Sequence, residues 1–337
     1  MPERRARRRL VWAALACVGV AVAAVSAGLL TRPHIPRVAP AQVGDDSVVE
    51  WRPRPEGIPD GGCPPPVDEL PPLDGSGPTR FAAIGDYGYA GPEEEAVADM
   101  VKAARPEFVL TLGDNNYPLG AADSIDLNIG LFYHEYIAPY VGRFGCGAGR
   151  NRFFPALGNH DWMTPGARPY LDYFTLPGNE RYYEVTWGRV GLFALDSDPS
   201  EPDGNTADSA QGRWLQGALA ASKARWKVVY MHHAPYSSGP HGSATWMRWP
   251  YKAWGADLVL AGHDHTYERF EIDGLPYVVN GMGGAVFYPL GKPVAGSVAR
   301  FNQNTGAIFF EADQTTLRAR FRTTNGLDID GVTLTKP

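Results

Sequence analysis

Residues 256–265 read ADLVLAGHDH, an apolar run that ends at Gly262 and passes directly into two closely spaced histidines. Short apolar runs of this kind are typical of buried β-strands. Four other apolar runs end in the same way, with a glycine or a histidine followed at once by polar residues. The four junctions are GDYGY at 85–89, GDNNY at 113–117, GNHD at 158–161 and HHAPYSSG at 232–239.

The chain from Arg80 onward predicts an α/β fold. Apolar runs predict strands at 80–85, 107–113, 152–158, 190–195, 226–232, 256–263, 276–281, 307–312 and 316–322. Amphipathic segments at 91–106 and 207–225 predict helices, the first with Pro92 and three glutamates in its first turn. Because strands and helices alternate early and strands dominate later, we expect two packed mixed β-sheets flanked by helices.

The polar junctions are expected to meet at one place, because ligand sites in α/β sheets form beyond the carboxyl ends of the strands. Carboxylate, imidazole, amide oxygen and phenolate together are ligands of first-row metals. They are too many for one tetrahedral zinc ion and suit two metals bridged by a carboxylate. Taken alone, Asp86 and Asp114 could instead cap helices. The side chains collected at the junctions are Asp86, Asp114, Tyr117, Asn159, His160, His232, His233, His263 and His265, with His241 just after them.

The five motifs, in this order, resemble those of the calcineurin-like metallophosphoesterase superfamily (D-x-[GH], G-D, G-N-H-[DE], a histidine, G-H-x-H). Two details are most similar to the small purple (tartrate-resistant type) acid phosphatases. Gly88 stands where many superfamily members have a metal-binding histidine, and Tyr117 follows Asp114 by three residues. The resemblance covers about residues 80–320 and implies the αββα sandwich of that superfamily.

The resemblance also implies roles for individual residues. A ferric ion would be held by Asp86, Tyr117 and His265, and a divalent iron, zinc or manganese ion by Asn159, His233 and His263. Asp114 would bridge the two ions. His233 is preferred to His232 because it precedes Pro235 by two residues, as the ligand histidine of the family precedes its proline. His160 and His241 are expected to contact the substrate phosphate or the leaving group.

The expected activity is hydrolysis of a small phosphomonoester by attack of metal-bound hydroxide. A phosphodiesterase or nucleotide pyrophosphatase of the same superfamily is the alternative, because metal ligands do not distinguish the substrates. A metal-loaded but inactive binding module is a third possibility. The aromatic segment TWMRWPYKAW at 245–254 is expected to pack a helix, with the wall of the substrate site as the alternative.

The N-terminus predicts export. Residues 1–9 carry five arginines, and residues 10–30 form an uncharged apolar segment that fits either a signal peptide or a transmembrane anchor. Residues 31–78 form a Pro/Gly-rich linker, and 79–337 the metallophosphoesterase domain. We expect a secreted or membrane-anchored protein facing outward. Cys63 and Cys146 could pair there or remain free thiols.

The remaining charge argues against a nucleic-acid partner. Outside residues 1–10 the chain has 26 basic and 36 acidic residues, whereas binding to a phosphate backbone needs a basic surface.

Overall fold

The computed structural model describes Cys63 and residues 77–337, whose strands form two sheets. The first has the order β13-β12-β11-β1-β2-β3. Its strands are β1 (Thr79–Ile84), β2 (Phe108–Thr111), β3 (Phe153–Pro155), β11 (Gly306–Ala312), β12 (Thr316–Thr323) and β13 (Asp328–Thr335). The second has the order β10-β8-β9-β7-β6-β5-β4. Its strands are β4 (Tyr183–Trp187), β5 (Val190–Ala194), β6 (Trp226–Tyr230), β7 (Leu258–Ala261), β8 (Tyr267–Ile272), β9 (Leu275–Asn280) and β10 (Ser297–Phe301).

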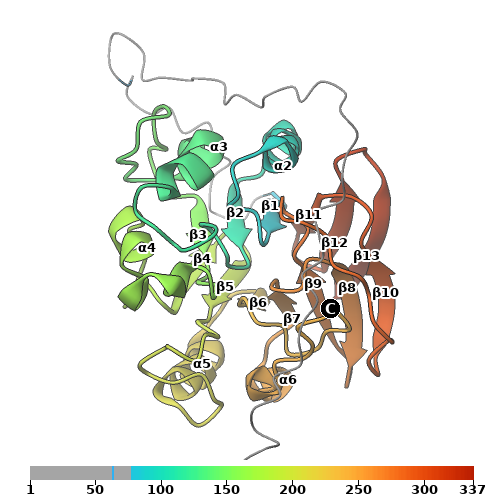
Figure 1. Ribbon diagram of the computed structural model, residues 1–337. Coiled ribbons are helices and arrows are strands. Elements are labelled where there is room, and N and C mark those ends of the chain that lie inside the picture. Colours follow the sequence, from blue (N-terminus) through green and yellow to red (C-terminus); the bar gives the residue numbers. More distant parts are fainter. Residues whose placement is uncertain (1–62, 64–76) are drawn as a thin grey trace, which may run out of the picture. The chain divides into compact units, whose positions relative to one another are not determined.

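Helices flank these sheets. Figure 1 shows α2 and α3 on one side of the strands and α5 and α6 on the other. The helices are α2 (Pro92–Ala104), α3 (Leu131–Tyr133), α4 (Arg168–Tyr173), α5 (Ala210–Ala221) and α6 (Tyr251–Trp254). There are also a short π-helix, η1 (Asp126–Gly130), and four short 3-10 helices, η2 (His134–Tyr136), η3 (Asp161–Met163), η4 (Pro165–Ala167) and η5 (Thr245–Met247). The predicted fold class, two mixed sheets with flanking helices, is confirmed.

Two apolar clusters hold the layers together. The larger includes Leu110 of β2 and Val228 of β6, and the ring of Phe81 stacked at 4.3 Å on Phe310. The smaller joins Val229 of β6 to Leu215 of α5. Because strand side chains alternate between faces, β6 contributes to both clusters and separates them.

The parallel strands determine where the site forms. In the first sheet β1, β2 and β3 are mutually parallel neighbours, and in the second β5, β6, β7 and β9 are. The loops after β1, β2, β3, β6 and β7 are the five motif junctions. Each sheet therefore presents the carboxyl ends of consecutive parallel strands, from which functional loops usually extend.

All nine predicted strands are present, and four strands were not predicted: β4, β8, β10 and β13. These lack a continuous apolar run, because β4, β10 and β13 lie at sheet edges and keep exposed residues along their length. β8 begins two residues after His265, in sequence that reads as a continuation of the GHDH motif.

Two features concern the N-terminal prediction. Cys63 and Cys146 form a disulfide across 83 positions of sequence, which decides between the two alternatives left open above. Within the described part of the chain, no helix has the length and apolarity needed to cross a bilayer. The predicted segments 1–9 and 10–30 and nearly all of the 31–78 linker lie outside the described residues.

Candidate metal centre

The loop residues that follow the strands adopt an unusual backbone conformation. Asp86, Asp114 and His263 have φ angles of 55°, 52° and 73°, a left-handed region that costs a non-glycine residue about 1 kcal/mol or more. Such strain persists only where surrounding contacts hold it, and it is often found at functional sites. Here the turn directs each side chain back toward the neighbouring motif.

A close approach requires glycine at the motif position before one of these residues. A Cβ on Gly262 would lie 2.5 Å from Oδ2 of Asp86 and 2.8 Å from the carbonyl of Leu112. The GHDH loop can therefore contact the GDYGY and GDNNY loops only because residue 262 is a glycine without a side chain. The backbone N–H of His263 then donates to both carboxylate oxygens of Asp86, at 3.1 and 2.9 Å.

The first group of donors surrounds the hydroxyl of Tyr117. This oxygen lies 2.9 Å from Oδ2 of Asp114, 3.3 Å from Oδ1 of Asp86 and 3.1 Å from Nε2 of His265. All four side chains are buried. The structure thus brings together the four residues predicted to surround a ferric ion.

Gly88 explains why this group of donors contains a tyrosine and no histidine from the GDYGY loop. A Cβ at residue 88 would lie 1.9 Å from the carbonyl oxygen of Asn115, so no side chain fits there. Tyr117 reaches the same group from the next loop, where its backbone N–H donates to the carbonyl of Gly88 at 2.7 Å.

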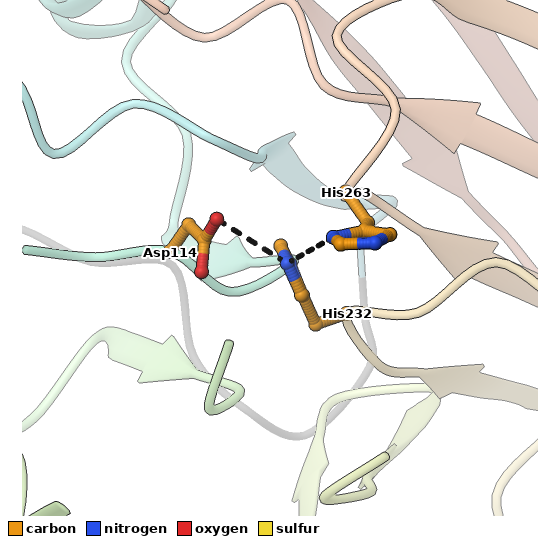
Figure 2. Close-up of side chains that lie close together, drawn as sticks. All are labelled: Asp114, His232 and His263. Carbon is orange, nitrogen blue, oxygen red and sulfur yellow. Dashed lines mark hydrogen bonds and ion pairs between the residues drawn. The ribbon is translucent and has the colours of Figure 1, made fainter. Parts of the chain in front are cut away.

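The second group of donors surrounds Nε2 of His232. This nitrogen lies 3.3 Å from Oδ2 of Asp114, 3.0 Å from Oδ1 of Asn159 and 3.1 Å from Nδ1 of His263. Figure 2 shows Asp114, His232 and His263 pointing toward one another. Oδ2 of Asp114 is shared by both groups, the position expected of a bridging carboxylate.

His233, the histidine preferred from its spacing to Pro235, occupies a neighbouring position. Its Nδ1 lies 2.9 Å from Oγ of Ser197, and the centroid of its ring lies 4.4 Å from that of His263, with the two rings tilted. The geometry places His232 among the donors and His233 next to them, which differs from the predicted order. Both histidines lie just beyond the end of β6 at Tyr230. Different partners hold their rings, the carbonyl of Leu112 for His232 and the hydroxyl of Ser197 for His233.

The donor set fits cations. Nδ1 of His232 lies 2.8 Å from the carbonyl of Leu112, and Nδ1 of His265 lies 2.7 Å from the carbonyl of Val286. These carbonyls fix the proton on Nδ1 and leave the Nε2 lone pairs directed into the two groups. Nitrogen and oxygen atoms then face each other at about hydrogen-bond distance, an arrangement that either a proton or a metal cation between them would stabilise.

Protonation equilibria in the metal-free protein reflect the same crowding. Burial would raise the pKa of Asp114, but the charge and hydrogen bond of His232 hold it well below its usual value. Burial would lower the pKa of His232, but Asp114 raises it to about 10. Burial and then the charges of Asp114 and Asp86 raise the pKa of the Tyr117 hydroxyl well above its usual value. Only a strongly polarising cation would therefore convert Tyr117 to phenolate.

The two histidines predicted to contact substrate lie beside the donor groups. Nδ1 of His160 is 2.6 Å from the carbonyl of Pro118, so its Nε2 is free, 4.0 Å from Oδ2 of Asp114. The ring of His241 stacks on that of His263 at 4.2 Å. Both side chains reach solvent, whereas the ring of His232 is fully buried.

Two buried aspartates and a half-buried tyrosine that support the site were not predicted. Asp161 accepts hydrogen bonds from the backbone of Gly158 and the side chain of Asn115, both at 2.8 Å. Asp264 accepts from the backbone N–H of His241 at 3.0 Å and from Oγ of Ser237. Both aspartates belong to quoted motifs, GNHD and GHDH, so their position in the motif was an available signal. Tyr288, whose ring stacks at 4.1 Å on His265, lies in a loop without such a signal.

Comparison with known proteins agrees with this geometry. The profile of the calcineurin-like phosphoesterase family matches residues 79–267. Purple acid phosphatase 17 of Arabidopsis thaliana is 28% identical over 64% of this chain and 71% of its own length. Human tartrate-resistant acid phosphatase type 5 is 25% identical over 64% of this chain and 76% of its own.

Solved structures share the fold. The purple acid phosphatase PPD1 from yellow lupin has a TM-score of 0.63 at 18% identity, over 77% of this chain and 54% of that one. GAP50, described as the anchor in the inner membrane complex of Plasmodium, has a TM-score of 0.61 at 18% identity, over 78% and 90%.

The motif-bearing loops on a double-sheet scaffold define a metal-dependent phosphohydrolase. The chain belongs to the calcineurin-like phosphoesterase family, and its relatives include purple acid phosphatases.

Proposed function

We propose that the chain is a dinuclear-metal phosphomonoesterase of the purple acid phosphatase kind. The observation that carries the proposal is the single oxygen, Oδ2 of Asp114, that both donor groups share. One group would hold an iron(III) ion through Asp86, Tyr117 and His265. The other would hold a divalent iron, zinc or manganese ion through Asn159, His263 and His232, with His233 as the alternative.

The metal ions, when bound, would supply charge neutralisation and an activated water for an in-line displacement at phosphorus. The chain's own residues would supply the rest. Nε2 of His160 is free to donate to a phosphoryl oxygen or to the leaving oxygen, since Pro118 already holds its Nδ1. His241, held by its backbone to Asp264 and by its ring to His263, offers a second donor on the substrate side.

Substrate assays test the monoester assignment. The purified protein should hydrolyse p-nitrophenyl phosphate much faster than bis-p-nitrophenyl phosphate. A reversed preference would support the phosphodiesterase alternative. Hydrolysis of neither compound by metal-replete protein would favour an inactive binding module.

Substitution of Asp114 tests the metal assignment. Asp114→Ala should remove bound metal and reduce activity by at least about a thousandfold, because both groups lose their shared oxygen. Asp123→Ala, at an exposed position in the same loop, is the matched control and should keep both. Metal-loaded, active Asp114→Ala protein would contradict the proposal.

Tyr117 carries the iron assignment. Wild-type protein with iron should absorb in the visible range through a tyrosinate-to-iron transition, and Tyr117→Phe should lose that band. A band that survives in Tyr117→Phe would contradict ligation by Tyr117.

We further propose that the protein is exported, anchored or secreted through residues 10–30. The Cys63–Cys146 disulfide supports this, because such bonds persist in oxidising compartments. Cell fractionation with N-terminal sequencing of the mature protein tests it. Recovery from the cytosol with reduced cysteines would contradict it.

A further inference from the structure

Exposed apolar side chains concentrate on the loops that carry the metal motifs. Of the nine large apolar residues exposed in the described chain, four lie on these loops and two on the loop after β9. We call them the apolar rim: Tyr89 (61% exposed), Leu119 (56%), Met163 (52%), Trp246 (40%), Val286 (81%) and Phe287 (36%). Side chains of this kind are normally scattered, and a concentration of them marks a binding surface.

Direct contacts tie three members of the rim to the donor groups. The ring of Tyr89 lies 6.3 Å from that of Tyr117, and the indole of Trp246 lies 5.8 Å from the ring of His233. The carbonyl of Val286 accepts from Nδ1 of His265 at 2.7 Å.

The other members lie next to residues with such contacts. Leu119 follows Pro118, whose carbonyl accepts from His160 at 2.6 Å, and the N–H of Met163 donates to the carbonyl of His160 at 3.2 Å. Phe287 precedes Tyr288, which stacks on His265. The rim therefore borders the site at which the phosphate would react.

The charged residues around the site also indicate which kind of ligand it would accept. The segments 85–91, 113–124, 158–167, 195–209, 232–247, 262–266 and 281–291 contain no lysine and no arginine. Basic residues follow three of them directly: Arg168 pairs with Asp172, Arg248 donates to the carbonyl of Pro235, and Lys292 continues the loop before β10. The segment 195–209 is acidic, and Nε1 of Trp246 joins it to the rim by donating to the carbonyl of Ser197 at 3.1 Å. Arg181, which reaches this segment, is already paired with Glu201 and Asp203. A second anionic group on the substrate would find no cationic side chain within these segments.

Resting on the proposed phosphomonoesterase function, we infer that the substrate is a phosphomonoester whose leaving group is apolar, an alkyl or aryl alcohol without further charge. The phosphate would occupy the donor groups while the apolar group lies against the rim. Nucleoside polyphosphates and acidic sugar phosphates would be disfavoured, because the segments that border the donor groups carry acidic and no basic side chains.

An n-alkyl phosphate series tests this inference, because ethyl, butyl and hexyl phosphate share their leaving-group chemistry and differ in apolar area. We expect kcat/KM of the metal-replete enzyme to rise about two- to fourfold per methylene, mainly through KM. Phenyl and 2-naphthyl phosphate form a second, aryl series. A rise in either series supports the inference and identifies the preferred group. Constant kcat/KM in both, or faster hydrolysis of ATP than of hexyl phosphate, overturns it. Failure to hydrolyse any of these esters would instead reject the phosphomonoesterase function.

A matched pair of variants assigns the effect to the rim. Leu119→Ser should lower kcat/KM for hexyl phosphate by roughly three- to tenfold and for ethyl phosphate far less. Leu327→Ser replaces a leucine of nearly equal exposure (57%) outside these loops and should change neither value. Binding of hexylphosphonate, followed by calorimetry, should show a negative heat-capacity change that is smaller in Leu119→Ser. Equal behaviour of the two variants on hexyl phosphate would overturn the inference.

Discussion

At the scale of single residues, one carboxylate oxygen organises the site. Oδ2 of Asp114 lies 2.9 Å from the hydroxyl of Tyr117 and 3.3 Å from Nε2 of His232, so the two donor groups meet there. The sequence predicted Asp114 at this position through motif order. The spacing to Pro235 predicted His233 as the ligand, whereas the imidazole nitrogen near this oxygen belongs to His232.

Substituting the two histidines separately tests that assignment. His232→Ala should lose most of the metal of the Asn159 and His263 group, because it removes the nitrogen at the centre of that group. His233→Ala should retain metal and lose a smaller part of its activity. Metal content by mass spectrometry decides the matter, and metal loss only in His233→Ala would restore the order predicted from sequence.

Metal binding should also release protons. His232 has a pKa of about 10 in the metal-free protein because of Asp114, so below that pH a metal ion must displace its proton. We expect the affinity of this group to fall about tenfold per unit decrease in pH between pH 8 and 6. Calorimetry in buffers of different ionisation enthalpy measures the released proton, and pH-independent affinity would contradict the described Asp114–His232 pair.

At the scale of elements, the segment that supplies two donors also anchors the substrate-side loop. Asp264 stands between His263 and His265, and it holds the backbone of His241 and the hydroxyl of Ser237. Four residues further along, Glu268 accepts from the N–H and hydroxyl of Ser238 at 2.8 and 2.7 Å. The loop bearing His241 is thus fixed to the start of β8, an arrangement that motif spacing alone does not reveal.

We therefore expect Asp264 to act as a positioning residue for His241. Asp264→Ala should raise KM about five- to tenfold while metal content stays unchanged, because a buried anchor worth roughly 1–2 kcal/mol is lost. Asp264→Asn, which still accepts a hydrogen bond, should recover most of the loss. Loss of metal together with activity in both variants would show that the residue acts on the donor groups instead.

At the scale of the whole molecule, the sequence predicted the strands with continuous apolar runs and the loops that follow them. Those strands, such as β2 and β7, are buried along their full length. A continuous apolar run predicts a strand only where the strand is buried in this way. Edge strands β10 and β13 are half-buried or exposed throughout, without a buried position, and were missed. The apolar rim was also missed, apart from Trp246 in the aromatic segment, because single exposed apolar residues on separate loops form no pattern until the fold assembles them.

The disulfide is a whole-molecule constraint that sequence left open. Cys63 precedes the first strand and Cys146 lies between α3 and β3. The bond therefore closes a long covalent loop of chain that contains β1 and β2. The Cys63→Ser/Cys146→Ser double variant should lose about 2–4 kcal/mol of unfolding free energy. Denaturant titration measures the loss, and a variant as stable as oxidised wild type would show that the bond contributes nothing.

The central claim is that distant loops from both sheets hold two metal ions on either side of Asp114. Anomalous diffraction from crystals of the metal-replete protein tests it most directly. We predict two peaks about 3.5–4 Å apart, one beside Tyr117 and His265 and the other beside Asn159, His232 and His263. A single peak, or peaks away from Asp114, would contradict the account.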